Sequence, residues 1–403
     1  MMKKCFTFLS LSLFLCPAWA DDDHHDARFP QDVRFKTRAL TPFAIEGLTG
    51  DNFGNLYTTG RTPGAGVACP VWRINLANPS VLVVVGSIPA PSPTTQCSPS
   101  GLTFDSAGRL FVTETDRIFS FFPDAGSPPL ATLFASGVPG TNGLAFDRDG
   151  NLWTGDGTSG QGRVWKITPA GVVTLEFRVP PMRNGTILGG DISVTGANEP
   201  AQGVGRQART YPHTAAGGNP QDLVANGVAF NHEGDLFIAD TARGAIWKVE
   251  FDRHGNLKSR TDCDSTFAEK TLCFDNIFVA HPLLDGTDGI ALDRAGNIWN
   301  SANERNAIVV VTKHRQVVEI FRNPPNAAGL RNSADAAVGN DRILETPTSP
   351  FLLGHVFCTA NSDGNRRDNF PNTAGEIRPA GPNVGKISCI DQPLQIPGLR
   401  LPL

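Results

Sequence analysis

Hydrophobic and polar residues alternate along most of this chain in short runs, and one such run recurs five times. Each copy begins with Gly and an aliphatic residue, has Asp or Asn at the fifth position and Gly at the eighth, and ends with an aliphatic and an aromatic residue. A glycine at a tight turn supplies positive φ, and an Asp or Asn side chain can bond the turn backbone. We therefore predict a β-hairpin for each copy, at residues 47–57, 101–111, 143–153, 227–237 and 289–299.

Further alternating runs follow these hairpins. Third strands are predicted at residues 71–74, 164–167 and 246–249, and fourth strands at 81–85, 172–177 and 317–321. Four antiparallel strands per unit are typical of a β-propeller blade. A sixth, degenerate unit is expected from residues 346–351, 356–358 and 385–389, with a strand near 35–40 closing the ring. The predicted fold class is all-β, a six-bladed β-propeller of four-stranded antiparallel blades.

The first 20 residues have the pattern of a secretory signal peptide. Lys3 and Lys4 precede a short apolar run, and small residues at Ala18 and Ala20 mark a cleavage site. We expect an exported protein, periplasmic or secreted, with a flexible segment at 21–34 and a single propeller at 35–395. Residues 180–222 are rich in Gly, Pro and Asn without periodicity, so they are expected to form an insertion that is either a lid or disordered.

Charge and composition narrow the classes of partner. The chain has 35 Lys and Arg against 39 Asp and Glu, so no basic surplus is available to neutralise a phosphate backbone. No stretch beyond the signal peptide approaches the roughly 20 apolar residues of a transmembrane helix. We expect a small-molecule substrate, no nucleic acid and no membrane, and leave a protein partner open.

Six cysteines remain after signal cleavage, and an even number in an oxidising compartment indicates disulfides. Pairing of sequence neighbours gives Cys69–Cys97, Cys263–Cys273 and Cys358–Cys389. The alternatives are other pairings or free buried thiols, since sequence alone does not fix connectivity.

One polar residue stands directly before the first glycine of every hairpin. The strand that begins each blade lines the central channel of a propeller, so these residues are expected to converge at one mouth; they are Glu46, Ser100, Asn142, Asn226 and Asp288. Two carboxylates and two amide oxygens form a site for a hard cation such as Ca²⁺. We predict Ca²⁺ as the cofactor, with Glu46, Asn142, Asn226 and Asp288 as ligands. The alternative is that each Asn-Gly or Asp-Gly pair only forms a turn or a bulge.

These same residues carry a family resemblance. Glu46-Gly47, Asn142-Gly143, Asn226-Gly227 and Asp288-Gly289, together with residues 239–241, resemble the signatures of the regucalcin/gluconolactonase (senescence marker protein) family of six-bladed propellers. Paraoxonase and diisopropyl fluorophosphatase are related to that family. The resemblance implies a catalytic calcium held by Glu of the first blade, Asn of the third and fourth, and Asp of the fifth.

Two functions follow from this pattern. The first is an exported calcium-dependent hydrolase of a lactone or ester, in which Asp288 is both a ligand and the catalytic base, and Ser100 and Asp240 contact the substrate. The alternative is a non-catalytic binding module with a structural calcium, and a lyase on a related propeller is a smaller third option. The fold alone does not choose between them. A serine hydrolase has no support, because no Gly-x-Ser-x-Gly motif occurs.

Overall fold

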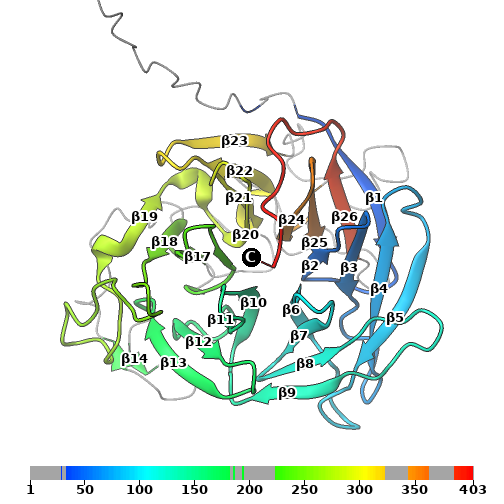
Figure 1. Ribbon diagram of the computed structural model, residues 1–403, viewed down its shortest axis with the longest axis horizontal. Coiled ribbons are helices and arrows are strands. Elements are labelled where there is room, and N and C mark those ends of the chain that lie inside the picture. The colour runs from blue at the N-terminus through cyan, green and yellow to red at the C-terminus, as the bar shows by residue number, and fades with distance from the viewer. Residues whose placement is uncertain are drawn as a thin grey trace, which may run out of the picture.

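The structure is a computed structural model that describes residues 29, 33–181, 185–186, 193–194, 223–322, 344–362 and 385–402. The predicted signal peptide, most of the 21–34 segment and most of the 180–222 insertion lie outside these residues. Six four-stranded antiparallel sheets surround a central axis (Figure 1), which confirms the predicted six-bladed propeller.

In the first five blades the strands follow chain order from the axis outwards (Figure 1). The predicted hairpins form the two inner strands of these five blades. The first three blades are β2 (Leu48–Gly50), β3 (Asn55–Thr59), β4 (Cys69–Asn75) and β5 (Leu82–Ile88); β6 (Pro99–Phe104), β7 (Leu110–Glu114), β8 (Arg117–Phe121) and β9 (Thr132–Ser136); and β10 (Thr141–Phe146), β11 (Leu152–Asp156), β12 (Arg163–Ile167) and β13 (Val173–Arg178). The next two are β16 (Val228–Phe230), β17 (Leu236–Asp240), β18 (Ala245–Val249) and β19 (Ile277–Ala280); and β20 (Thr287–Leu292), β21 (Ile298–Ala302), β22 (Ala307–Val311) and β23 (Val317–Arg322).

The sixth blade joins the two ends of the chain. Its inner strands are β24 (Pro347–Leu353), β25 (Val356–Asn361) and β26 (Gly385–Ile390), and its outer strand is β1 (Phe35–Thr41). β1 pairs antiparallel with β26, from Phe35 opposite Ile390 to Thr41 opposite Gly385. The predicted closing strand is therefore present, and the ring has no unpaired end.

The repeated Asp and Gly form each hairpin turn as expected. In the third blade the Asp147 carboxylate accepts hydrogen bonds from the backbone N–H of Asp149 and of Asn151, at 3.0 and 2.8 Å, and from the Trp153 indole at 2.8 Å. The eighth-position glycine, Gly150, has a φ of +80°. One acidic side chain thus fixes both the turn and the aromatic residue that packs behind it.

The hydrophobic core lies between neighbouring blades. Trp153 and Val164 of the third blade pack with Val228 and Trp247 of the fourth, and all four are buried. Because each blade covers the next, the rigid ring fixes the positions of the strands that border the axis.

The three predicted disulfides are confirmed: Cys69–Cys97, Cys263–Cys273 and Cys358–Cys389. Such bridges are typical of proteins from an oxidising compartment. The helices of the described part are short 3₁₀ turns, η3 (Phe274–Asn276), η4 (Pro282–Leu284) and η5 (Asn303–Arg305). None of the helices in the described ranges is long and apolar enough to cross a membrane.

Candidate functional site

A polar cavity of about 420 Å³ opens at one end of the central channel. All five residues predicted to converge there line it: Glu46, Ser100, Asn142, Asn226 and Asp288. Ser100, Asn142 and Asp288 lie in the first strand of their blades, and Glu46 and Asn226 lie two residues before it. The sixth blade contributes Thr348 of β24, whose hydroxyl donates to the Glu46 carbonyl at 2.6 Å and so closes the circle.

A local irregularity in the inner strands places these side chains. The pairing register between the first and second strands shifts between Thr141 and Leu144 in the third blade and between Thr287 and Ile290 in the fifth. Asn142 and Asp288 lie within these bulges, and a bulge re-aims the side chain of the strand that carries it. The sequence left two alternatives for the Asn-Gly and Asp-Gly pairs: a structural turn or bulge, or part of a binding site. In the structure Asn142 and Asp288 lie in a bulge and also line the cavity.

The glycine after each of these residues is required by contact between blades. A Cβ on Gly101 would lie 2.1 Å from the carbonyl oxygen of Asn142, and a Cβ on Gly227 would lie 2.5 Å from that of Asp288. These glycines therefore let the backbones of neighbouring first strands approach each other, which holds the ring of polar residues together.

Thr241 orients the amide of Asn226. The Thr241 hydroxyl donates to the Thr287 carbonyl at 2.6 Å and accepts from Asn226 Nδ2 at 3.1 Å. The amide oxygen Oδ1 is left buried without a hydrogen-bond partner. A Cβ on Gly157 would lie 2.7 Å from this oxygen and 2.8 Å from Asn142 Nδ2, so Gly157 keeps open the space where the two amides meet.

Asp288 is buried and lies close to a second carboxylate. Burial and the charge of Glu46 raise the pKa of Asp288 well above its usual value, while hydrogen bonds from Asn303 and Asn226 and the charge of Arg61 partly offset the rise. Asn303 Nδ2 donates to Asp288 Oδ2 at 2.8 Å. An ion-free site therefore disfavours the charged form of Asp288, which a bound cation would favour.

The second carboxylate, Glu46, pairs with a cation from the same blade. Arg61 Nη1 donates to Glu46 Oε2, and Arg61 Nε and Nη2 both donate to the hydroxyl of Ser98, at 3.1 and 2.7 Å. The backbone around Arg61 is fixed, because its N–H donates to the Ala44 carbonyl and that of Thr62 donates to the Cys97 carbonyl. Arg61 is thus a built part of the cavity wall.

Asp240 is not brought to this cavity. Its carboxylate is fully buried and accepts from Arg243 Nη1 at 2.8 Å and from the Trp247 indole at 2.9 Å. Burial raises the pKa of Asp240, and Arg243 and Trp247 offset part of the rise. Two other blades also pair an acid that ends the second strand with an arginine that follows it in the chain: Glu114 with Arg117 and Asp156 with Arg163. This repetition, visible in the sequence, indicates a structural role.

Sequence reasoning missed Arg61, Asn303, Thr241 and Gly157. Thr241 and Gly157 directly follow the second strands of their blades, Arg61 is the second residue after β3, and Asn303 begins η5 after β21. The signal that could have found them is their common position after the second strand of each inner hairpin. In an antiparallel hairpin this position lies beside the start of the first strand, where the residue before the repeat glycine stands.

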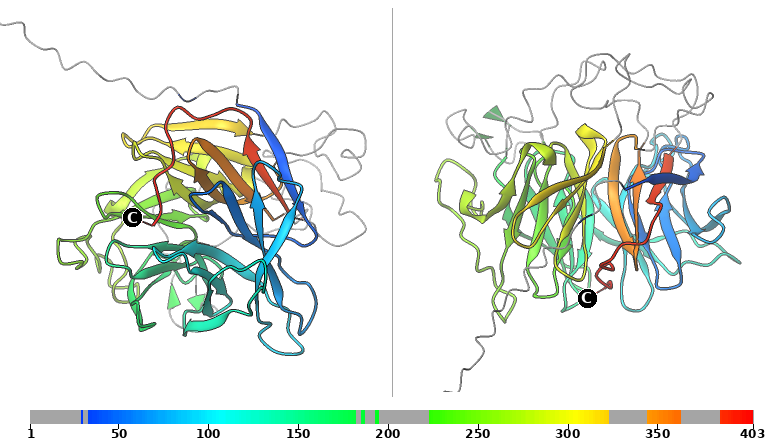
Figure 2. Two further views of the ribbon diagram at one scale, coloured as in Figure 1. Left: turned by 45° about the vertical axis from the view of Figure 1, so that its right-hand side comes forward. Right: turned by 90° about the horizontal axis from the view of Figure 1, so that it is seen from above.

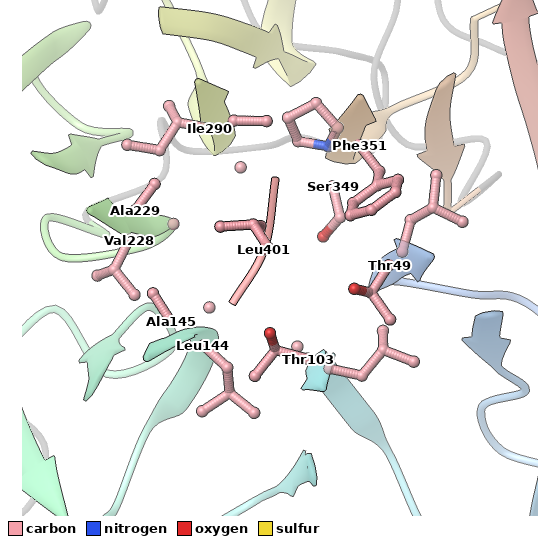
Figure 3. A pocket seen from close by; sticks show the side chains of 18 of the residues that line it. Thr49, Thr103, Leu144, Ala145, Val228, Ala229, Ile290, Ser349, Phe351 and Leu401 are labelled. Carbon is pink, nitrogen blue, oxygen red and sulfur yellow. The ribbon is translucent and has the colours of Figure 1, made fainter. Parts of the chain in front are cut away.

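The opposite end of the channel is apolar. A small cavity of about 90 Å³ is lined by residues further along the first strands, including Leu144, Val228 and Ile290. Leu401 of the C-terminal segment lies in the middle of this ring of side chains (Figure 3), and the segment crosses the corresponding face of the propeller (Figure 2). Asn142, Asn226 and Asp288 line both cavities, so they separate the polar mouth from the apolar one.

The donors in the polar cavity suit a hard cation. In the part of the chain that the structure describes, no three His, Cys, Asp or Glu side chains come together, so amide oxygens must complete any metal site. Two carboxylates and two amides, one of which is Asn226 with its orphaned oxygen, fit Ca²⁺, which prefers oxygen ligands, better than Zn²⁺.

Comparisons with known proteins bear on the fold and on the family resemblance. The family described as the SMP-30/Gluconolactonase/LRE-like region matches residues 204–330, which include Asn226 and Asp288. The predicted resemblance to the regucalcin/gluconolactonase family is confirmed. No match was found among curated proteins.

Three solved structures show the same fold at low identity. A luciferin-regenerating enzyme is 13% identical with a TM-score of 0.53, covering 91% of this chain and 97% of that one. A calcium-binding protein, regucalcin from Agrobacterium tumefaciens, is 17% identical with a TM-score of 0.51, covering 92% and 96%. The PQQ-bound aldose sugar dehydrogenase of Streptomyces coelicolor is 13% identical with a TM-score of 0.51, covering 90% and 100%. At these identities the likeness shows the fold, and the site must decide the chemistry.

Proposed function

We propose that this chain, which resembles the SMP-30/gluconolactonase family, is an exported calcium-dependent hydrolase of a lactone or ester. The observation that carries the proposal is the convergence of Glu46, Asn142, Asn226 and Asp288 in one polar cavity at the end of the channel. The family match over the fourth and fifth blades, which supply Asn226 and Asp288, supports a lactonase-type activity.

Glu46, Asn142, Asn226 and Asp288 would hold the calcium ion. When bound, the ion supplies a Lewis acid that polarises a carbonyl oxygen and stabilises the negative charge that develops on it. The ring of inner strands contributes preorganisation, because Thr241 holds the Asn226 amide and Asn303 holds the Asp288 carboxylate before any ligand arrives.

Asp288 is proposed as the catalytic base. With calcium bound, the Asp288 carboxylate would be kept ionised, so that it could accept a proton from the attacking water. Asn303 occupies Oδ2 and thereby fixes the plane of the carboxylate. Ser100 lines the same cavity and would offer its hydroxyl to the substrate.

The test is hydrolysis of a panel of aldonolactones, γ-lactones and aryl esters by the purified mature protein, with calcium and after removal of metal by a chelator. We expect turnover that disappears with the chelator and returns with calcium, at unchanged circular dichroism. If every substrate stays intact while metal analysis shows one calcium per chain, the alternative of a binding module with a structural calcium replaces the hydrolase.

Export is tested separately. The three disulfides support folding in an oxidising compartment. Protein recovered from the periplasm or medium should begin at Asp21, as read by N-terminal sequencing. A chain that keeps its first 20 residues and stays with the cytosol would contradict export.

A further inference from the structure

We propose that Arg61 makes the cavity selective for anionic ligands, so that the preferred substrate is a lactone or ester that bears a carboxylate. That the anionic ligand is a substrate rests on the proposed function. The preference for an anion rests on the cavity alone. Neither the repeat nor the predicted ligand set includes Arg61.

The first argument is charge. Among the described residues that line the cavity, Arg61 is the only one with a cationic side chain, and Glu46 and Asp288 are the only ones with carboxylates. A divalent cation would cancel the two carboxylates and leave the Arg61 charge uncompensated. The loaded cavity would then carry a net positive charge and attract an anion.

The second argument is the geometry of the guanidinium. Nε and Nη2 of Arg61, the edge that can bind both oxygens of a carboxylate, meet a single neutral oxygen, Ser98 Oγ, at 3.1 and 2.7 Å. A ligand carboxylate would form two charge-assisted bonds on that edge, where now one hydroxyl accepts both. The side chain is 28% exposed, so a ligand in the cavity can reach it.

The third argument is the character of the remaining wall. The described lining is mostly hydroxyl and amide groups with no aromatic ring; Leu223 and Ala44 are its apolar side chains. Such a wall binds small polar molecules by hydrogen bonds and offers no flat apolar surface to an aryl group. The backbone hydrogen bonds of Arg61 and Thr62 fix the segment that carries the guanidinium group, which reduces the entropic cost of binding a ligand to it.

The experiment compares two γ-lactones that differ only in charge, 5-oxotetrahydrofuran-2-carboxylate and its primary amide, at saturating calcium. The measured quantity is the ratio of kcat/KM for the carboxylate to that for the amide, since a general loss of activity cancels in the ratio. Wild type should favour the carboxylate, and Arg61→Gln should lower the ratio by about 10- to 100-fold, the loss expected for a hydrogen bond to a charged group. Arg61→Lys should lie between them.

The matched control is Arg148→Gln, which removes an exposed arginine from the hairpin turn of the third blade and should keep the wild-type ratio. An equal ratio in wild type and Arg61→Gln would overturn the inference. If no lactone is hydrolysed, the proposed function fails and calorimetry decides the inference. Tetrahydrofuran-2-carboxylate, which has no ester bond, should then bind wild type at least about tenfold more tightly than Arg61→Gln. Equal binding to both proteins, or binding to neither, would overturn it.

Discussion

Two buried aspartates have different surroundings and different roles in this protein. Asp240 faces an arginine and an indole that satisfy it, whereas Asp288 faces the carboxylate of Glu46. A buried charge without a full set of partners lowers stability, and such groups are typical of functional sites. The two residues should therefore respond differently to substitution.

Asp288→Asn should raise the melting temperature of the metal-free protein and weaken calcium binding. The substitution removes a buried charge next to Glu46, and it also removes one of two carboxylates available to the ion. Thermal melts in chelator and calcium titration calorimetry measure the two effects. A lower melting temperature together with unchanged calcium affinity would contradict both the electrostatics and the ligand assignment.

The stability of the metal-free protein should also depend on pH through Asp288. Its folded-state pKa is raised, so between the unfolded and folded pKa values the native protein binds more protons than the unfolded chain. The contribution of Asp288 is therefore fully present below about pH 4 and is lost as pH rises through the folded pKa. Melts of wild type and Asp288→Asn across pH should show a difference that grows with rising pH; parallel curves would count against the shift.

Asp240→Ala should destabilise the protein by about 3–5 kcal/mol, because it leaves Arg243 buried without its main anion. Calcium affinity of the folded fraction should match wild type, since Asp240 lies outside the cavity. Urea unfolding and calcium titration provide the measurements. A loss of calcium binding without a loss of stability would return Asp240 to the site.

Among the structural elements, the inner hairpins are the ones that could be predicted from the sequence, because their pattern repeats. Turn glycines, the capping Asp and the alternating pattern occur at fixed spacing, so five inner hairpins and the five polar residues beside them could be placed by number alone. The direction of the Arg61 and Asn303 side chains could not be predicted, because both residues follow the hairpins in connections of unequal length, where no period sets which way a side chain points. For Asp240, alternation does not show whether an acid at a strand end faces the channel or a nearby arginine, and in the structure its carboxylate pairs with Arg243.

Asp147→Ala should lower the free energy of unfolding by about 2–4 kcal/mol, as it removes a carboxylate that several donors share. Asp105→Ala is the matched control in the neighbouring blade. Asp105 caps the same turn and accepts from Arg109 Nε at 3.1 Å where Asp147 accepts from Asn151 Nδ2 at 2.9 Å, but Phe111 stands in place of the tryptophan and donates nothing. Denaturant titration should show the larger loss for Asp147; equal losses would mean that the indole hydrogen bond contributes little.

At the scale of the whole molecule, the ring depends on how the last blade is held. Cys358 and Cys389 lie opposite each other on β25 and β26, and their bridge spans 31 residues of sequence. Replacing both with Ser should cost about 3–4 kcal/mol in unfolding free energy through the larger freedom of the unfolded chain. The Cys263–Cys273 pair spans 10 residues, so its double replacement should cost less, about 2–3 kcal/mol by the same relation. The reverse order, measured by denaturant titration, would contradict this account.

The pairing of β1 with β26 also decides how the molecule would respond to mechanical force. Phe35, at the start of β1, lies opposite Ile390, at the end of β26, so a pull on these two points loads one end of the ladder only. The backbone hydrogen bonds run perpendicular to the strands and would open one pair at a time, as in a zipper, where a pull along the strands would load all of them together. β26 would stay behind on β25, because the Cys358–Cys389 bridge joins them covalently. Tension between these two points would therefore open the closed ring at the seam where its two ends meet and peel away β1, while the other five blades kept their own pairings.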